Sequence, residues 1–267
     1  MYRVIRMIKY DFKGQLTVVT GGASGIGEGI CEAFAKNSSD VAIIDINENA
    51  GLNLASKLKK DYKVRANFYR CDITDFEKVK KTSESILLDF KRVDNIITAA
   101  GYSSRFSITE LGIDEWKKAV DVNLNGTFYI IKAFIGKLLE QKKGNIILIG
   151  SGAIVTGSGG GVHYAATKVA QYGICKALTY ELLSQGIRSN IITPHIIDTP
   201  MLRKRYPDNP EMNAKLAARV PLGRVGLPSD IANIALFLAS DESGYVCGEE
   251  IIADGGGLFY QGFSPKK

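Results

Sequence analysis

Histidine and cysteine are scarce in this chain of 267 residues. The two histidines are His163 and His195, and the four cysteines are Cys31, Cys71, Cys175 and Cys247. None of them forms a Cys-x-x-Cys motif or another spacing typical of a metal site. We therefore expect no metal, and we expect reduced thiols that pack as small buried hydrophobic groups in a cytoplasmic protein.

Long apolar runs and blocks of one charge are also missing. No run reaches the ~20 apolar residues that a membrane span needs, and residues 1–10 lack the apolar centre of a signal peptide. We expect those ten residues to be a short extension before the first strand. The net charge is +6, but Lys and Arg are mixed with Asp and Glu, which is typical of solvated helix faces. We expect neither a nucleic-acid partner nor a membrane partner.

Short segments rich in β-branched residues alternate with helical segments along the chain. The expected strands are Leu16–Thr20, 41–46, 64–69, 93–99, 145–150, 188–193 and 250–253. The expected helices are 25–37, 47–60, 75–90, 114–141, 164–183 and 229–239. Repeated strand–helix–strand units of this kind predict an α/β fold with a parallel sheet and helices on both faces. No linker divides the chain, so we expect one domain over residues 1–267.

Residues 195–226 are the least regular part of the chain, with several prolines and many charges. They follow the sixth expected strand, and ligands of doubly wound sheets bind beyond the carboxyl ends of strands. We therefore interpret this segment as a lid or substrate loop. A solvated surface excursion is the alternative, and the two are compatible.

A glycine-rich turn separates the first strand from the first helix. Gly21, Gly25 and Gly27 let the backbone turn tightly and approach a ligand closely. A helix that begins there directs unpaired N–H groups at the turn, which favours a diphosphate. Glycine clusters also occur in ordinary loops, so the turn alone is a weak signal.

One acid, Asp45, lies at the end of the second expected strand, and another, Asp72, follows the third. Asp45 can accept hydrogen bonds from the adenosine ribose, and its neighbours Ser24 and Ile46 are not basic, which favours NAD over NADP. The alternative is a helix-capping or surface acid. Asp72 can lie near the adenine amine or cap the helix that follows.

Four polar residues suit chemistry on an alcohol or a ketone. Tyr164 and Lys168 stand one helical turn apart, and a nearby ammonium lowers the pKa of a phenol. Ser151 ends the fifth strand and points toward the same crevice. Asn123 is an amide among apolar residues, and a water linked to Lys168 is one partner it could have. Each residue also has an ordinary structural explanation.

The order of these motifs resembles the compact, single-domain branch of the short-chain dehydrogenase/reductase family. The matching residues span nearly the whole chain and are Thr20, Gly21, Gly25, Gly27, Asp72, Ala99, Ala100, Gly101, Asn123, Ser151, Tyr164, Lys168, Asn190, Pro194, Thr199 and the run 254–256. Three positions depart from the family pattern, namely Thr98, Gly150 and His195. Thr98 stands where Asn is usual, and His195 replaces a glycine close to the nicotinamide.

The resemblance implies a Rossmann-like, doubly wound sheet of seven strands and an NAD(P)-dependent oxidoreductase that acts on a CH–OH group. Tyr164 would be the acid/base, and Lys168 would bind the nicotinamide ribose and lower the pKa of the tyrosine. Ser151 would orient the substrate, and Asn123 would hold a proton-relay water. The implied cofactor contacts are Gly21, Ser24, Gly25, Ile26, Gly27, Asp45, Ile46, Asp72, Ile73, Ala99, Ala100, Gly101, Tyr164, Lys168, Pro194, Ile197 and Thr199. A homotetramer, or a dimer, would be built from the long helices and the last strand.

The substrate is expected to be a small alcohol or ketone that contacts Ser103, Ser151 and His195. The polar residues Ser104, Arg105 and His163 favour a polyol or sugar. Residues 203–205 could meet an acidic substrate, although a solvated run is favoured. With NAD as the preferred cofactor, alcohol oxidation is the favoured direction.

Other functions remain open. A reductase of a 3-oxoacyl or xenobiotic ketone is the main alternative. A non-catalytic dinucleotide sensor is disfavoured because Tyr164 and Lys168 are both present. A sugar-nucleotide epimerase would need a further substrate domain.

Overall fold

The computed structural model describes residues 10–258; the expected N-terminal extension lies almost wholly outside them. Seven parallel strands form one sheet in the order β3-β2-β1-β4-β5-β6-β7. The strands are β1 (Leu16–Thr20), β2 (Asp40–Asp45), β3 (Ala66–Arg70), β4 (Asn95–Thr98), β5 (Gly144–Ile149), β6 (Ile187–Pro194) and β7 (Glu250–Ala253). The order reverses between β1 and β4, which confirms the Rossmann-like, doubly wound fold expected from the sequence.

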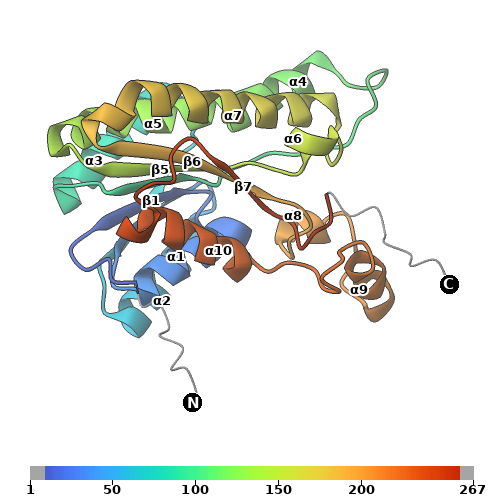
Figure 1. The fold of residues 1–267 in the computed structure, drawn as a ribbon, viewed down its shortest axis with the longest axis horizontal. Coiled ribbons are helices and arrows are strands. Elements are labelled where there is room, and N and C mark those ends of the chain that lie inside the picture. Colours follow the sequence, from blue (N-terminus) through green and yellow to red (C-terminus); the bar gives the residue numbers. More distant parts are fainter. Residues whose placement is uncertain (1–9, 259–267) are drawn as a thin grey trace.

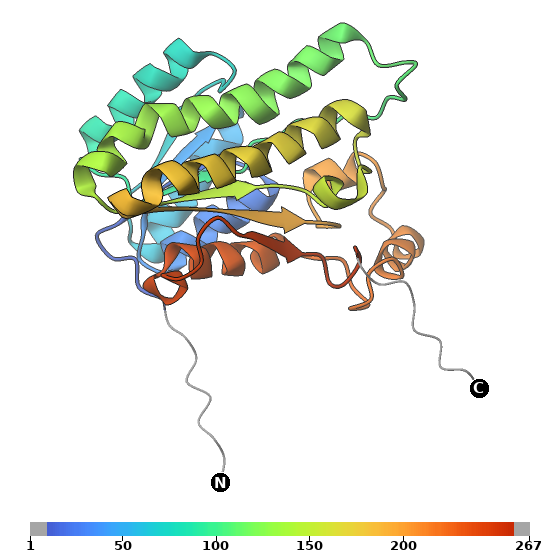
Figure 2. The same ribbon diagram turned by 45° about the horizontal axis from the view of Figure 1, so that its top comes forward.

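Helices cover both faces of the sheet (Figure 1). One layer contains α3 (Phe76–Phe90), α5 (Gly126–Gln141) and α7 (Gly161–Leu182). The opposite layer contains α1 (Gly25–Lys36), α2 (Glu48–Tyr62) and α10 (Pro228–Ala239). The remaining helices are α4 (Ile113–Val120), α6 (Ala153–Thr156), α8 (Pro200–Arg203) and α9 (Pro210–Ala217). Figures 1 and 2 show α8 and α9 beyond the carboxyl ends of the strands.

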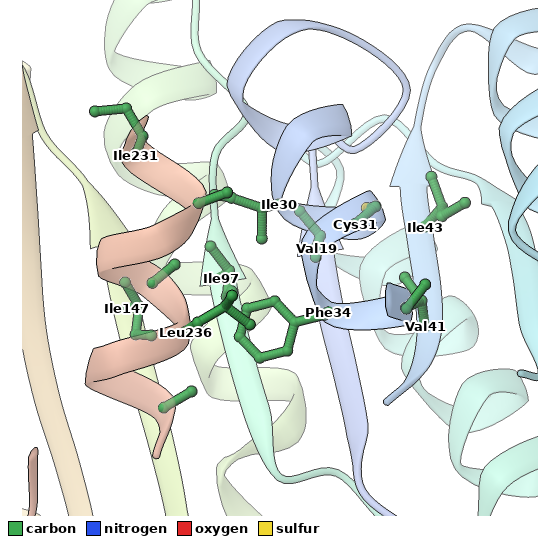
Figure 3. Packing of buried hydrophobic residues seen from close by; sticks show 14 of the residues in the cluster. Val19, Ile30, Cys31, Phe34, Val41, Ile43, Ile97, Ile147, Ile231 and Leu236 are labelled. Atoms are coloured by element: carbon green, nitrogen blue, oxygen red, sulfur yellow. The ribbon is translucent and has the colours of Figure 1, made fainter. Parts of the chain in front are cut away.

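The central strands are buried on both faces, and alternate residues feed two separate cores. Val18 packs in the core beneath α3, α5 and α7, whereas Val19 packs in the core beneath α1, α2 and α10. Figure 3 shows the second core, in which Phe34 of α1 lies near Ile97 and Leu236 of α10. This two-sided burial explains the continuous apolar runs of the strands.

Most expected elements are confirmed, and the differences have local causes. The third strand begins at Ala66 rather than at residue 64, because α2 runs to Tyr62 and its C-cap, Lys63, has a left-handed conformation with φ of 60°. The long helix expected at 114–141 is interrupted by a π-helical segment, Asp121–Asn125. Three short helices were not predicted from the sequence, namely α6 and, within residues 195–226, α8 and α9.

The cysteines depart from the expectation at one position. Cys31, Cys71 and Cys175 are buried, but Cys247 is partly exposed. None of the four is in a disulfide. Within residues 10–258, no three metal-ligating side chains come together, and no helix is long and apolar enough to cross a membrane.

Candidate active site

A cavity of about 620 Å³ lies over the glycine-rich turn, at the carboxyl ends of β1, β2 and β4. Thirteen of the predicted cofactor residues line it. They are Gly21, Ser24, Gly25, Ile26, Gly27, Asp45, Ile46, Asp72, Ile73, Ala99, Ala100, Gly101 and Thr199. The structure thus brings together residues from positions 21 to 199 along one continuous hollow.

The start of α1 is built to receive an anion. The side chain of its N-cap residue, Ser24, makes no capping hydrogen bond. The N–H groups of the first turn therefore remain available as donors to a ligand. A Cβ at Gly27 would lie 2.2 Å from the carbonyl oxygen of Gly21, so any side chain there would block the turn. These features fit the diphosphate of a dinucleotide.

Asp45 of β2 holds the glycine-rich turn by accepting hydrogen bonds from the backbone. Its Oδ2 accepts a 3.1 Å bond from the N–H of Ala23, and its Oδ1 accepts a 2.9 Å bond from the N–H of Asn47. The helix-capping alternative for Asp45 is wrong, because Asn47 is the N-cap of α2. Each carboxylate oxygen retains a lone pair for a ribose hydroxyl.

Asp72 does not cap α3 either. The N-cap is Asp75, whose side chain accepts a bond from the N–H of Lys78. Asp72 instead accepts bonds from the N–H and the hydroxyl of Thr74, while it lines the larger cavity.

A second cavity of about 300 Å³ continues from the first toward α7 and residues 195–219. The remaining predicted residues line it, except for Asn123. They are Ser103, Ser151, Tyr164, Lys168, Pro194, His195 and Ile197. Seven residues line both cavities, and these are Ile26, Ala99, Gly101, Ser103, Thr199, Met201 and Arg205. The two hollows therefore meet where the cofactor and substrate parts of the predicted site should join.

Tyr164 and Lys168 lie on one face of α7, as their spacing predicts. Burial raises the pKa of the Tyr164 phenol, while the Ser151 hydroxyl and the charge of Arg205 act in the opposite direction. Burial also lowers the pKa of Lys168 to about 8. Burial is the largest influence on the Tyr164 phenol, and its pKa lies above the usual value. That Lys168 lowers this pKa stays a prediction. The ammonium lies 5.8 Å from the ring centroid and donates elsewhere.

The ammonium of Lys168 has two acceptors, both in the protein interior. Nζ donates to the carbonyl oxygen of Ile149 at 2.8 Å and to Oε1 of Gln171 at 3.1 Å. The Nε2 of Gln171 in turn donates to the carbonyl oxygen of Asn123 at 2.7 Å. A fully buried side chain thus connects the lysine to the asparagine. The ammonium can only donate, so the orientation of the Gln171 amide follows from chemistry.

Asn123 is placed by the π-helical segment and by three side-chain bonds. Its amide bonds the backbone N–H and C=O of Tyr102 at 2.7 and 2.9 Å, and donates to Thr167. Its carbonyl accepts from Thr127 as well as from Gln171, so both lone pairs are used. The relay water implied for Asn123 stays a prediction, and a water on this carbonyl would have to displace the bond from Thr127 or Gln171.

The two histidines have different surroundings. His195 lines the smaller cavity, and its ring packs so closely on Gly152 that a Cβ there would lie 2.9 Å from Cδ2. His163 is fully buried and bonds the hydroxyl of Ser104 at 2.9 Å. His163 and Ser104 do not line the cavity, so their suggested substrate contact is wrong.

Several lining residues were not predicted individually as contacts. The larger cavity also includes Asn47, Tyr102 and Met201, and the smaller one includes Ile196, Tyr206, Leu216 and Arg219. Lys204, which the sequence suggested for an acidic substrate, lines the larger cavity as well. Gln171 was missed too, although its three-residue spacing from Lys168 places both on one helix face. The residues of α8 and α9 carried no periodic signal that would aim them at the site.

Chemically, the site combines a diphosphate-binding turn, a ribose acceptor and a half-buried tyrosine with the Ser151 hydroxyl beside its phenol. The phenol can exchange a proton with a small alcohol or ketone oxygen, and Ser151 can donate or accept a bond at the same oxygen. The smaller cavity adjoins the larger one, so a reacting carbon can lie next to a bound dinucleotide.

Comparisons with known proteins agree with this geometry. Residues 21–257 match a family model described as Enoyl-(Acyl carrier protein) reductase. The chain is 36% identical over 239 residues to a 3-oxoacyl-[acyl-carrier-protein] reductase of Chlamydia muridarum, covering 90% of this chain and 95% of the relative. It is 32% identical over 251 residues to a D-threitol dehydrogenase of Mycolicibacterium smegmatis, covering 93% and 95%.

A solved structure of similar fold was determined with a ligand. It is a 3-oxoacyl-[acyl-carrier protein] reductase with bound NAD from Brucella melitensis, 33% identical, with a TM-score of 0.85. The likeness covers 94% of this chain and 93% of that one.

Proposed function

Because the chain belongs to the short-chain dehydrogenase/reductase family, whose members are NAD(P)-dependent oxidoreductases, we propose that it interconverts a secondary alcohol and its ketone with NAD. The proposal rests mainly on one observation, which is that Ser151, Tyr164 and Lys168 line a cavity continuous with the dinucleotide turn. A polyol or sugar alcohol is the proposed substrate type.

In the proposed oxidation, the phenolate of Tyr164 takes the hydroxyl proton of the alcohol. The hydrogen on the carbon that bears this hydroxyl leaves as hydride. Bound NAD supplies the hydride acceptor. Ser151 hydrogen-bonds the reacting oxygen, and Lys168 binds the nicotinamide ribose. Asn123 and Gln171 hold the lysine and the backbone at Tyr102 in place. Reduction runs the same steps backward, with the phenol as the acid.

NAD is preferred over NADP in this proposal because of Asp45. A 2′-phosphate would meet its carboxylate, and within residues 10–258 no cation forms an ion pair with that group. The NAD bound to the similar structure from Brucella melitensis is consistent with this preference.

The two named relatives favour different substrates. One is a D-threitol dehydrogenase, which supports a polyol, and the other is a 3-oxoacyl-[acyl-carrier-protein] reductase, which supports the alternative of a 3-oxoacyl ketone. The polar lining of the smaller cavity, with Ser103, Ser151 and His195, favours the polyol.

The proposal includes a lid and an oligomer. Residues 195–226 would act as the substrate loop of a single domain, since α8, the turn that follows it and α9 bring Leu202, Arg205 and Leu216 to the smaller cavity. Exposed apolar side chains on α5 and α7, such as Phe128, Val169 and Tyr180, support a homotetramer or dimer through these helices.

An absorbance screen at the NADH band tests the function. Polyols, sugars, hydroxy acids, secondary alcohols and 3-oxoacyl thioesters are each assayed with NAD(H) and NADP(H). Turnover that disappears in the Tyr164→Phe variant supports the proposal. Substrate-dependent turnover that is unchanged in that variant contradicts the mechanism, and NADH binding without turnover of any substrate supports a sensor instead.

A further inference from the structure

The two cavities of the site differ in charge. The larger cavity includes two carboxylates, Asp45 and Asp72, and two cations, Lys204 and Arg205, so its charges balance. The smaller cavity includes Arg105, Arg205 and Arg219 in addition to Lys168, and neither Asp nor Glu is among its described lining residues. A cavity in which one sign of charge predominates concentrates ligands of the opposite sign.

The three arginines are not neutralised by nearby acids. Within the described part of the chain, no Asp or Glu forms an ion pair with any of them. Two other arginines of residues 195–226 do have such partners. Arg203 forms two 2.7 Å bonds to Asp198, and Arg224 bonds both oxygens of Asp230. Acidic partners thus balance the charges of Arg203 and Arg224, whereas the three arginines that line the smaller cavity have no such partner.

Arg205 is held in place without losing its charge. It donates to the carbonyl oxygen of Gly159 and to the hydroxyl of Ser103, each at 2.5 Å. Both partners are neutral. Its charge acts on the reacting centre, where it opposes the upward shift that burial causes in the Tyr164 pKa. Arg205 therefore lies within electrostatic reach of the position at which the substrate oxygen should bind.

Arg105 and Arg219 both act on one phenol at the same cavity. Burial would raise the pKa of the Tyr206 phenol, but the charges of Arg105 and Arg219 lower it overall. These two arginines line only the smaller cavity, whereas Arg205 lines both. Arg105 and Arg219 therefore line the part of the site where the substrate should bind, whereas Arg205 also lines the part where the cofactor should bind. Arginine is suited to this because its fork of donors matches a carboxylate or a phosphate.

We propose that the substrate carries an anionic group, a carboxylate or a phosphate, which Arg105, Arg205 and Arg219 bind while its reacting hydroxyl lies at Tyr164 and Ser151. This inference rests on the proposed function and narrows its polyol substrate to an acidic or phosphorylated one. The cavity of about 300 Å³ suits a small molecule.

The test uses three matched probes, namely ribitol, D-ribonate and D-ribitol 5-phosphate. Their binding to the NADH-saturated protein is measured by calorimetry at low and high salt, and their oxidation is followed at the NADH band. We expect at least one anionic probe to bind about tenfold more tightly than ribitol, with a preference that salt weakens. Ribonate and the phosphate ester distinguish the two kinds of anion.

The double variant Arg105→Gln/Arg219→Gln should reduce the ratio of anionic to neutral binding by about tenfold. Lys60→Gln removes one charge from an exposed position in the last turn of α2 and should leave the ratio unchanged. Equal or weaker binding of both anions than of ribitol, or no detectable anion binding, overturns the inference. So does a ratio that the double variant leaves unchanged.

The two proposals fail in different ways. If neutral alcohols are oxidised in a Tyr164-dependent manner without any preference for anions, the proposed function stands and the anion site is overturned. If the arginines select anions in the calorimeter but no alcohol is oxidised, the anion site stands and the proposed function is contradicted.

Discussion

The side-chain oxygen of Gln171 accepts a 3.1 Å hydrogen bond from the ammonium of Lys168, three residues earlier on α7. Gln171 has a second bond, from its Nε2 to Asn123, and a third at 3.0 Å to the hydroxyl of Thr127. Its amide is therefore satisfied on both sides in a fully buried position. The only other acceptor of the ammonium is the backbone oxygen of Ile149, so Gln171 supplies the only side-chain control over the lysine among the described residues.

Substitution of Gln171 should change the pH at which Lys168 loses its proton. The pKa of Lys168 is about 8, and activity that needs the ammonium falls as pH rises through this value. Gln171→Leu removes an acceptor and should move the fall in kcat/KM to lower pH. Gln171→Glu places a carboxylate beside the ammonium and should move it to higher pH.

The opposite directions separate positioning from packing. If Gln171 only fills space, both variants should lower thermal stability without moving the pH at which kcat/KM falls. A melting curve for each variant therefore accompanies the pH profile of kcat/KM, which reports on the free enzyme.

Tyr164→Phe should lower kcat by about 10²- to 10⁴-fold, the usual contribution of one acid/base group. Burial raises the pKa of the phenol, so the free protein holds it protonated at pH 7, and oxidation should speed up as pH rises toward 8, where loss of the Lys168 proton begins to oppose it. The variant should lose this rise while it binds NADH normally in a fluorescence titration. Loss of NADH binding together with activity would indicate a structural role.

Asp45→Asn should weaken NAD binding by about tenfold, because charge-assisted hydrogen bonds are replaced by neutral ones. An amide oxygen can still accept from Ala23 or Asn47, so the turn is disturbed less than by Asp45→Ala. Binding of NADP should improve in the same variant, since repulsion of its 2′-phosphate is removed. A native protein that prefers NADP would contradict this interpretation of Asp45.

His195 and Gly152 should behave as a coupled pair. Gly152→Ala would place a methyl group 2.9 Å from the His195 ring, and overpacking of this kind costs about 1–3 kcal/mol. Gly257 also approaches the ring closely. His195→Gly should remove that clash, so the double variant should melt at a higher temperature than Gly152→Ala alone.

The single variant His195→Gly should also widen the smaller cavity. We expect the ratio of kcat/KM for bulky over small ketones to rise about tenfold. Thermal melting of the three variants and kinetics with two ketones of different size provide both readouts. Additive melting shifts would show that the two residues do not interact.

The sequence was sufficient for the fold because two independent patterns agree on it. The apolar runs of β1, β4 and β5 predict strands covered on both faces, and the glycine turn predicts a helix starting at Gly25. Predicted cofactor positions also come together, since they follow strands whose carboxyl ends meet at one edge. Residues such as Asp45 and Ser151 could be located from that rule alone.

The sequence could not predict which distant charges share a cavity or how strongly a side chain is buried. Arg105 and Arg219 are separated by more than a hundred positions, and only the tertiary fold brings them to one cavity. The pKa of Tyr164 depends on its desolvation and on Arg205, neither of which helical spacing reveals. The closeness of Gln171 to Asn123 depends on how α7 packs against the π-helical segment.

The shared walls of the two cavities have a kinetic consequence. Ser103, Met201 and Arg205 border both hollows, so a molecule seated in the smaller one covers part of the exit from the larger one. The dinucleotide should therefore bind before the substrate. The product should leave before the dinucleotide. Product-inhibition patterns would display this as competition between oxidised and reduced dinucleotide alone.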